Sequence, residues 1–181
     1  MNMDRIMGVL TLKAPTYREI ADDPNATTPA AIIVIVVALL QAVIGAVVLN
    51  SLGASLPQAP GLASSLNPVR FAIQTVVTAI IGWFIASWVF AFVSKTFFGG
   101  KTNTSEMLRV FGFTQIFQII GIIPCLGIIG LILSIIGAII GIREASEFDT
   151  TKAILTGIIG FIAVLIVSVV VGIILAAVGL I

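Results

Sequence analysis

Four glutamines are the polar side chains best placed to do chemistry inside the long apolar segments of this chain: Gln41, Gln74, Gln115 and Gln118. An amide both donates and accepts hydrogen bonds, so these residues can bridge neighbouring helices or line a polar path. We favour bridging, and keep as an alternative a conduit for a neutral solute or a lipid. No acidic or basic residue falls near the centre of an apolar segment, which argues against a proton-coupled pump or a cation transporter.

The bases and carboxylates that hydrolysis within a membrane requires are missing from the predicted bilayer region of the sequence. It contains no histidine and a single cysteine, Cys125, so a serine or cysteine nucleophile would have no base beside it. A pair of carboxylates at membrane depth is also missing, and one cysteine can form neither an internal disulfide nor a multi-ligand zinc site. We therefore expect a protein that is not an enzyme and uses no cofactor and no metal. We also expect no nucleic-acid partner.

A short connection near the end of the chain gathers five charged residues between two apolar blocks. We interpret them, with two basic residues of an earlier connection, as a surface that binds a protein partner. The proposed residues are Lys101, Arg109, Arg143, Glu144, Glu147, Asp149 and Lys152. A solvated connector without a partner is the alternative interpretation.

The elements that must position these residues are membrane-spanning helices. The chain has 181 residues, of which 59% are hydrophobic and 9% are charged, whereas about 25% of the residues in a soluble domain are charged. Apolar blocks of about 20 residues cross a bilayer as helices, because the backbone must satisfy its own hydrogen bonds there. The sequence predicts an all-α integral membrane protein with five spans, over Pro29–Leu52, Phe71–Ser94, Thr104–Ile123, Cys125–Ile142 and Lys152–Leu180.

The third and fourth blocks are short and share a link that contains Pro124. Proline removes a backbone donor and clashes with the preceding turn, so we expect a break there and a tight helical hairpin. Capping residues support two helix starts. Asn103 and Glu106 have the spacing of a capping box, and Asp149 or Thr150 precedes the last helix.

The N-terminal segment, residues 1–28, precedes the five-helix domain of residues 29–181. It carries charges throughout and lacks the apolar core of a cleavable signal. Ile6, Val9 and Leu10 would share one side of a helix, which predicts a short interfacial helix lying on the lipid headgroups.

The basic residues predict the orientation. Of the nine lysines and arginines, eight fall on one side of the predicted membrane and Arg70 falls on the other. The positive-inside rule then places the N-terminus in the cytoplasm and the C-terminus outside. The Ile/Val-rich helices suit a prokaryotic cell membrane.

Small residues recur along the last two predicted helices, at Gly130, Ser134, Gly137, Gly141, Gly160 and Gly172. Such stripes allow close approach of two helices. We favour packing within one chain, with a homo-oligomer as the alternative.

An ordered set of short motifs resembles the prokaryotic branch of the Yip family. The motifs are Lys13-Ala-Pro-Thr-Tyr-Arg-Glu-Ile-Ala-Asp-Asp-Pro24, Phe97-Phe-Gly-Gly-Lys101, Arg109-Val-Phe-Gly-Phe113, Ile123-Pro124, Gly141-Ile-Arg-Glu144 and Thr151-Lys-Ala153. The resemblance implies a five-span membrane protein without catalytic residues, and eukaryotic members of the family interact with Rab-type small GTPases. It favours a membrane scaffold or adaptor with a role resembling membrane trafficking, which recruits partners or organises lipids through its cytoplasmic loops.

Overall fold

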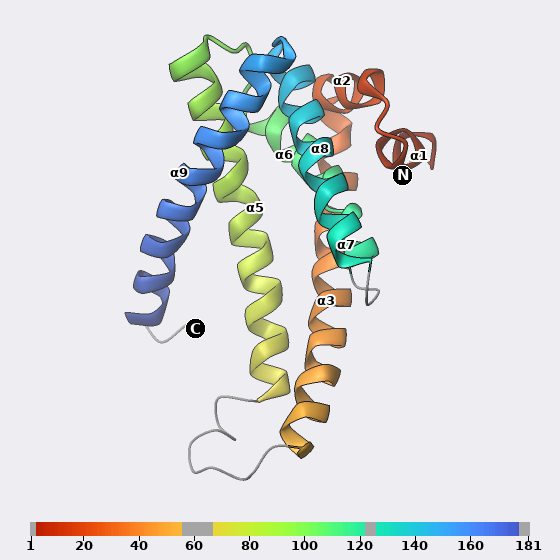
Figure 1. Ribbon diagram of the computed structural model, residues 1–181, viewed down its shortest axis with the longest axis vertical. Coiled ribbons are helices and arrows are strands. Elements are labelled where there is room, and N and C mark those ends of the chain that lie inside the picture. The colour runs from red at the N-terminus through yellow and green to blue at the C-terminus, as the bar shows by residue number, and fades with distance from the viewer. Residues whose placement is uncertain (1–2, 56–66, 122–125, 178–181) are drawn as a thin grey trace.

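A computed structural model describes residues 3–55, 67–121 and 126–177, and within these ranges every regular element is a helix (Figure 1). The elements are α1 (Met3–Leu10), α2 (Ala14–Asp22), the 3₁₀ helix η1 (Pro24–Ala26), α3 (Thr27–Ser55), α5 (Pro68–Phe98), α6 (Thr104–Thr114), α7 (Phe117–Gly121), α8 (Gly127–Ser146) and α9 (Thr150–Ala177). The all-α prediction is confirmed.

Four of the described segments are long and apolar enough to cross a membrane: Pro24–Ser51, Pro68–Phe98, Gly127–Ser146 and Thr150–Ile174. The predicted count of five spans is therefore not confirmed. The missing one is the third block, which forms two short helices instead of one long helix.

The break in the third block lies between α6 and α7, at Gln115 and Ile116. The backbone N–H of Ile116 bonds to the carbonyl of Phe113 (3.2 Å), and that of Gln118 bonds to the carbonyl of Gln115 (2.9 Å). These i→i−3 bonds tighten the turn as in a 3₁₀ helix. The prediction of one continuous helix over Thr104–Ile123 is therefore wrong. The expected break at Pro124, and Cys125 beside it, lie outside the described residues.

Two long helices and a shorter hairpin form the body of the molecule. In Figure 1, α3 and α5 run side by side, α6 packs against both, α7 and α8 pair as the hairpin, and α9 diverges from α5 toward the C-terminus. The connections α5–α6 and α8–α9 gather with α1 and α2 at one end, the top of Figure 1. We call this the charged end. Helix α9 is the least covered span, with 6% of its most apolar stretch buried, so its aliphatic side chains are left to face lipid.

The N-terminal helices fold against the protein. Tyr17 and Ile20 of α2 are fully buried, and α2 packs on α6 and α8. Val9 of α1 is fully buried and Ile6 nearly so. The interfacial helix that we predicted from these residues is therefore not confirmed, because their apolar side chains contact protein. An amphipathic pattern buries its apolar face equally well against helices or against lipid.

Small residues let α8 approach its neighbours within the chain. A Cβ added at Gly130 would lie 2.8 Å from the backbone nitrogen of Gly121, and one added at Gly137 would lie 2.8 Å from the ring of Phe117. Gly141 packs in the same way against Val110 of α6, and Gly160 of α9 packs against Phe90 of α5.

Two of the predicted packing residues have a different environment. A Cβ on Gly172 would meet no described atom within 4 Å, so this glycine makes no close approach to the described chain. Ser134 lines a cavity.

Both predicted helix caps are present. Asn103 and Glu106 form a complete capping box at the start of α6. The carboxylate of Asp149 accepts the backbone N–H of Lys152 (2.8 Å) in the first turn of α9. These caps fix where the two chain connections at the charged end enter their helices.

Candidate functional site

One acidic residue joins three segments at the charged end. Glu147 forms ion pairs with Arg18 of α2 (2.7 Å) and with Lys101 of the α5–α6 connection (2.8 Å). Arg18 also donates to the carbonyl of Glu144 (2.9 Å) and pairs with Asp22 (2.7 Å). We call these five residues the Glu147 cluster. Glu147 has a φ of +56° and closes α8 in the left-handed region, which turns its side chain out of the helix.

The ion pairs shift the pKa of two members of the cluster, Glu147 and Arg18. Hydrogen bonds from Lys101 and then from Arg18 hold the pKa of Glu147 below its ordinary value. Hydrogen bonds to Glu147 and Asp22 raise the pKa of Arg18 above its ordinary value. Both shifts favour the charged forms of Glu147 and Arg18.

A second group of ion pairs joins α1 to α2. Arg5 of α1 pairs with Glu19 (2.8 Å) and with Asp23 (2.7 Å) at the end of α2. The hydrogen bond from Arg5, followed by that from the backbone of Asn25, lowers the pKa of Asp23. The two groups of ion pairs tie α1 to α2, and α2 to the corner between α8 and α9.

The residues that the sequence predicted as a partner-binding surface largely pair with one another. Arg143 bonds to Glu144 (2.8 Å) and to the hydroxyl of Thr150 (3.4 Å). The ammonium group of Lys152 lies 5.8 Å from the centre of the Phe148 ring, within cation–π range. Lys101 has the most exposed side chain among the members of these ion pairs, at 78%.

Arg109 lies away from this surface. Its residue is 7% exposed, and it donates a short hydrogen bond to the carbonyl of Ala21 in α2. Its Nε has no hydrogen-bond partner among the described residues. The prediction that Arg109 belongs to a partner-binding surface does not fit this burial. Arg109 instead holds the end of α2 against α6.

Sequence reasoning missed the ion pairs of Arg5 and Arg18. It also missed the buried hydroxyl of Tyr17, which donates to the carbonyl of Val9 (3.3 Å). Arg18 and Tyr17 fall within the N-terminal motif that carried the family resemblance, but nothing local in the sequence indicates their partners. The amide carbonyl that Arg18 reaches belongs to a residue 126 positions away.

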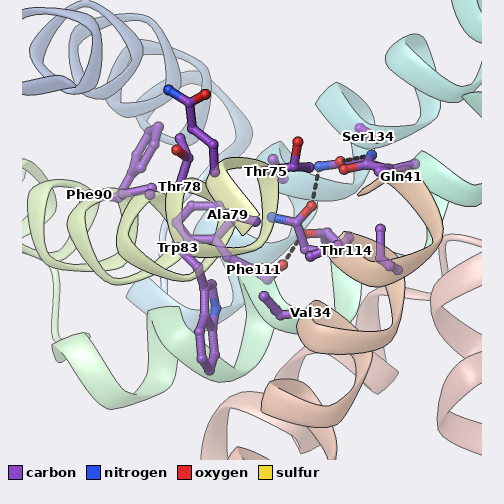
Figure 2. A pocket seen from close by; sticks show the side chains of 18 of the residues that line it. Val34, Gln41, Thr75, Thr78, Ala79, Trp83, Phe90, Phe111, Thr114 and Ser134 are labelled. Carbon is purple, nitrogen blue, oxygen red and sulfur yellow. Dashed lines mark hydrogen bonds between the residues drawn. The ribbon is translucent and has the colours of Figure 1, made fainter. Parts of the chain in front are cut away.

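A cavity of about 670 Å³ lies among α3, α5, α6, α7 and α8, and Figure 2 shows side chains converging on it. All four predicted glutamines line it. Gln41 donates to the amide oxygen of Gln118 (2.7 Å), and Gln118 donates in turn to Gln115 through a short bond. Gln41, the midpoint of α3, is thus joined to the broken helix α6–α7 by a chain of amides. This arrangement contains the interhelical bonding that the sequence favoured.

Trp83 forms part of the cavity wall nearer the charged end. The residue is 6% exposed, and its indole N–H donates to the carbonyl of Leu108 in α6 (2.9 Å). Trp88 and Phe92 lie on another face of α5, exposed and stacked on each other at 5.8 Å, as expected for aromatic residues that contact lipid. Of the two tryptophans, Trp83 is thus the one that joins helices.

Comparison with known proteins identifies the family. The family model described as the Yip1 domain matches residues 7–176. The chain belongs to the Yip1 family. No curated protein and no solved structure matches it. The match begins within α1 and ends within α9, so in this Yip1 protein the N-terminal helices are part of the same family unit as the apolar spans. Together with its four apolar helices, this identifies the Yip1 protein as an integral membrane protein.

The two regions of this Yip1 protein offer different chemistry. The Glu147 cluster presents fixed charges that can pair with polar groups of another protein. Among the described residues that line the cavity, none carries a charge, so the cavity offers hydrogen bonds and apolar contacts.

Proposed function

We propose that this Yip1 protein is a non-enzymatic membrane scaffold whose charged end binds a protein partner. The observation that carries the proposal is the Glu147 cluster, which joins α2, the α5–α6 connection and the end of α8 into one polar surface. Binding costs less when a surface is already ordered, because fewer side chains lose freedom on association. A role resembling membrane trafficking, and a partner resembling a small GTPase, are suggested by the family resemblance.

The distribution of charge supports a cytoplasmic position for this surface. Eight of the nine basic residues belong to α1, α2 and the link between them, or to the segments around the α5–α6 and α8–α9 connections, and these segments gather at the charged end (Figure 1). Arg70, at the start of α5, is the exception. By the positive-inside rule the charged end faces the cytoplasm, in the cell membrane if the source is prokaryotic.

The test is site-specific photocrosslinking in intact cells. A photoreactive amino acid replaces Lys101, whose side chain is 78% exposed, and in a matched control it replaces Arg70 at the other end of α5. We expect one defined protein to be crosslinked at position 101 and absent at position 70. The purified partner should then bind the wild-type protein about tenfold or more tightly than the variant Lys101→Glu. Identical products at both positions would contradict the proposal.

A second candidate function is favoured by one observation, the position of all four glutamines on one cavity. It is the conduit for a neutral solute or a lipid. Reconstituted vesicles should then show faster flux of small neutral solutes, or faster transbilayer movement of lipids, than protein-free vesicles. Rates equal to those of protein-free vesicles would rule it out.

A further inference from the structure

We propose that the cavity binds one uncharged membrane lipid that carries a free hydroxyl group, of the diacylglycerol type. The proposal goes beyond the scaffold function and does not depend on it, because the cavity and the Glu147 cluster share no residue. It requires binding alone and no flux across the membrane.

The polar lining of the cavity leaves hydrogen-bonding capacity open on both sides. Within the amide chain, the Oε1 atom of Gln41 and the Nε2 atom of Gln115 have no hydrogen-bond partner among the described residues. Gln74 on the opposite helix α5 has no hydrogen-bond partner in the same set of residues, and neither does the hydroxyl of Ser134. Amides at membrane depth are costly to leave unpaired. A ligand with a group that both donates and accepts would satisfy them.

The lining also sets the charge of the ligand. The polar residues of the cavity are amides and hydroxyls, and none of its described lining residues is acidic or basic. A charged phosphate headgroup would lose its hydration there without gaining an opposite charge. An alcohol loses less hydration than an ion does, and it regains hydrogen bonds in the cavity, because it donates one hydrogen bond while accepting others.

The remaining walls suit the apolar body of a lipid. Val34 and Val37 of α3 are almost fully buried and face the cavity together with Trp83, Phe90 and Phe111. Figure 2 shows Val34, Trp83, Phe90 and Phe111 around the same space as the polar side chains of Gln41 and Thr114. Burial of hydrocarbon against such walls is worth about 25 cal/mol per Å².

Size and position agree with a ligand taken from the bilayer. The volume of about 670 Å³ falls within the range of about 300–1,000 Å³ usual for ligand sites. The cavity is partly open, and three of the helices around it, α3, α5 and α8, are candidate membrane spans. Gln41 is the midpoint of α3, and the middle of a membrane-spanning helix lies at the depth of the hydrocarbon core, so the accessible ligands are lipids.

Two glycines provide a matched pair of variants for the test. Gly82 of α5 lines the cavity, and Gly172 of α9 does not. A Cβ added at either position meets no described atom within 4 Å, so Leu fits both without a clash at the Cβ. Gly82→Leu partly fills the cavity, whereas Gly172→Leu makes the same chemical change at a distance from it.

The experiment uses the full chain in phosphatidylcholine vesicles with photoactivatable lipid probes. The first probe is a diacylglycerol, the second is the same molecule with its hydroxyl acetylated, and the third is a phosphatidylglycerol. We expect the first probe to label residues of α3, α5 or α6 in the wild type and in Gly172→Leu, and to label Gly82→Leu at least tenfold less. The acetylated probe should label the wild type about threefold to tenfold less, the loss expected for one hydrogen bond. The charged probe should label it less than the diacylglycerol does, because its phosphate loses hydration in a cavity without an opposite charge.

A second variant keeps the test valid if Gly82→Leu fails to fold. In Gln74→Leu the new side chain is similar in size to glutamine but lacks the amide group. This variant should lower labelling by the diacylglycerol while leaving labelling by the acetylated probe unchanged. The proposal is wrong if Gly82→Leu and Gly172→Leu are labelled equally, if the three probes label equally, or if the label lies on the outer face of α9. Water as the only occupant would appear as labelling no higher than that of an unrelated membrane protein.

Discussion

Replacement of Gly130 by alanine tests whether α7 and α8 are held together by backbone contact. A Cβ at this position would lie 2.8 Å from the backbone nitrogen of Gly121, 2.9 Å from the carbonyl oxygen of Phe117 and 3.2 Å from the Cα of Gly121. All three are backbone atoms, so no side chain can rotate away to make room. Helices α7 and α8 must separate by about 0.5–1 Å to restore ordinary contacts of about 3.5 Å.

The change in the free energy of unfolding caused by Gly130→Ala is the sum of two opposing effects. Overpacking of this kind costs about 1–3 kcal/mol, and replacement of glycine by alanine within a helix returns up to about 1 kcal/mol. Gly130→Ala should therefore lower the free energy of unfolding by about 0–2 kcal/mol. Gly172→Ala has the same propensity gain without the clash, because its Cβ meets no described atom. The difference between the two variants isolates the steric term, and we expect about 1–3 kcal/mol.

The assay is equilibrium unfolding in mixed detergent micelles, followed by the fluorescence of Trp83 and Trp88. Trp83 is the sensitive reporter, because it lies between α5 and α6 and donates to Leu108. The two variants are compared under identical conditions, with wild type as the reference. If Gly130→Ala and Gly172→Ala have the same free energy of unfolding to within about 0.5 kcal/mol, the close approach of α7 and α8 does not contribute to stability. The inference that backbone contact holds these two helices together would then be wrong.

Three further predictions concern the charged end and the cavity wall. Glu147→Gln should destabilise the protein near neutral pH. Because the folded-state pKa of Glu147 is lowered from 4.5, the loss of stability relative to wild type should be complete above that pH and should shrink as the pH falls below it. The measurement is the free energy of unfolding of both proteins across this pH range. A difference between them that does not change with pH would contradict a contribution from the ion pairs. Trp83→Phe removes the hydrogen bond to Leu108 and should cost about 1 kcal/mol in the same unfolding assay, and an unchanged midpoint would contradict this role. Asn103→Ala removes the cap of α6 and should cost about 0.5–2 kcal/mol, with Asn103→Ser as a control that keeps most of the stability.

Four of the five predicted spans and both caps could be predicted because their causes are local. An apolar run of about 20 residues specifies a helix in lipid wherever it packs. The capping box at the start of α6 depends only on Asn103 and Glu106, three residues apart, and the cap of α9 depends on Asp149 and the residues that follow it. Interactions within one turn of helix leave a pattern in the sequence, and that pattern was sufficient to predict where α6 and α9 begin.

The burial of Arg109 could not be predicted because its partner is distant in sequence. Beside a polar connection, an arginine is ordinarily exposed. Here α2 folds over it, and the hydrogen bond reaches the carbonyl of Ala21, 88 positions earlier. The same holds for the N-terminal apolar residues, such as Ile20, because the pattern that predicts a buried face does not identify what covers it.

The break between α6 and α7 explains why four separate glutamines lie on one cavity. In a continuous helix Gln115 and Gln118 would lie on one face above regular i→i−4 backbone bonds. The i→i−3 bonds at Gln115–Gln118 tighten the turn at the level of Gln41, where the amide chain of Gln41, Gln118 and Gln115 joins α3 to the shorter hairpin. Neither proline nor glycine is needed at this point, since the side-chain amides themselves stabilise the junction. The polar residues thus hold the irregular helix in place, and their remaining donors and acceptors point to the ligand that we propose for the cavity.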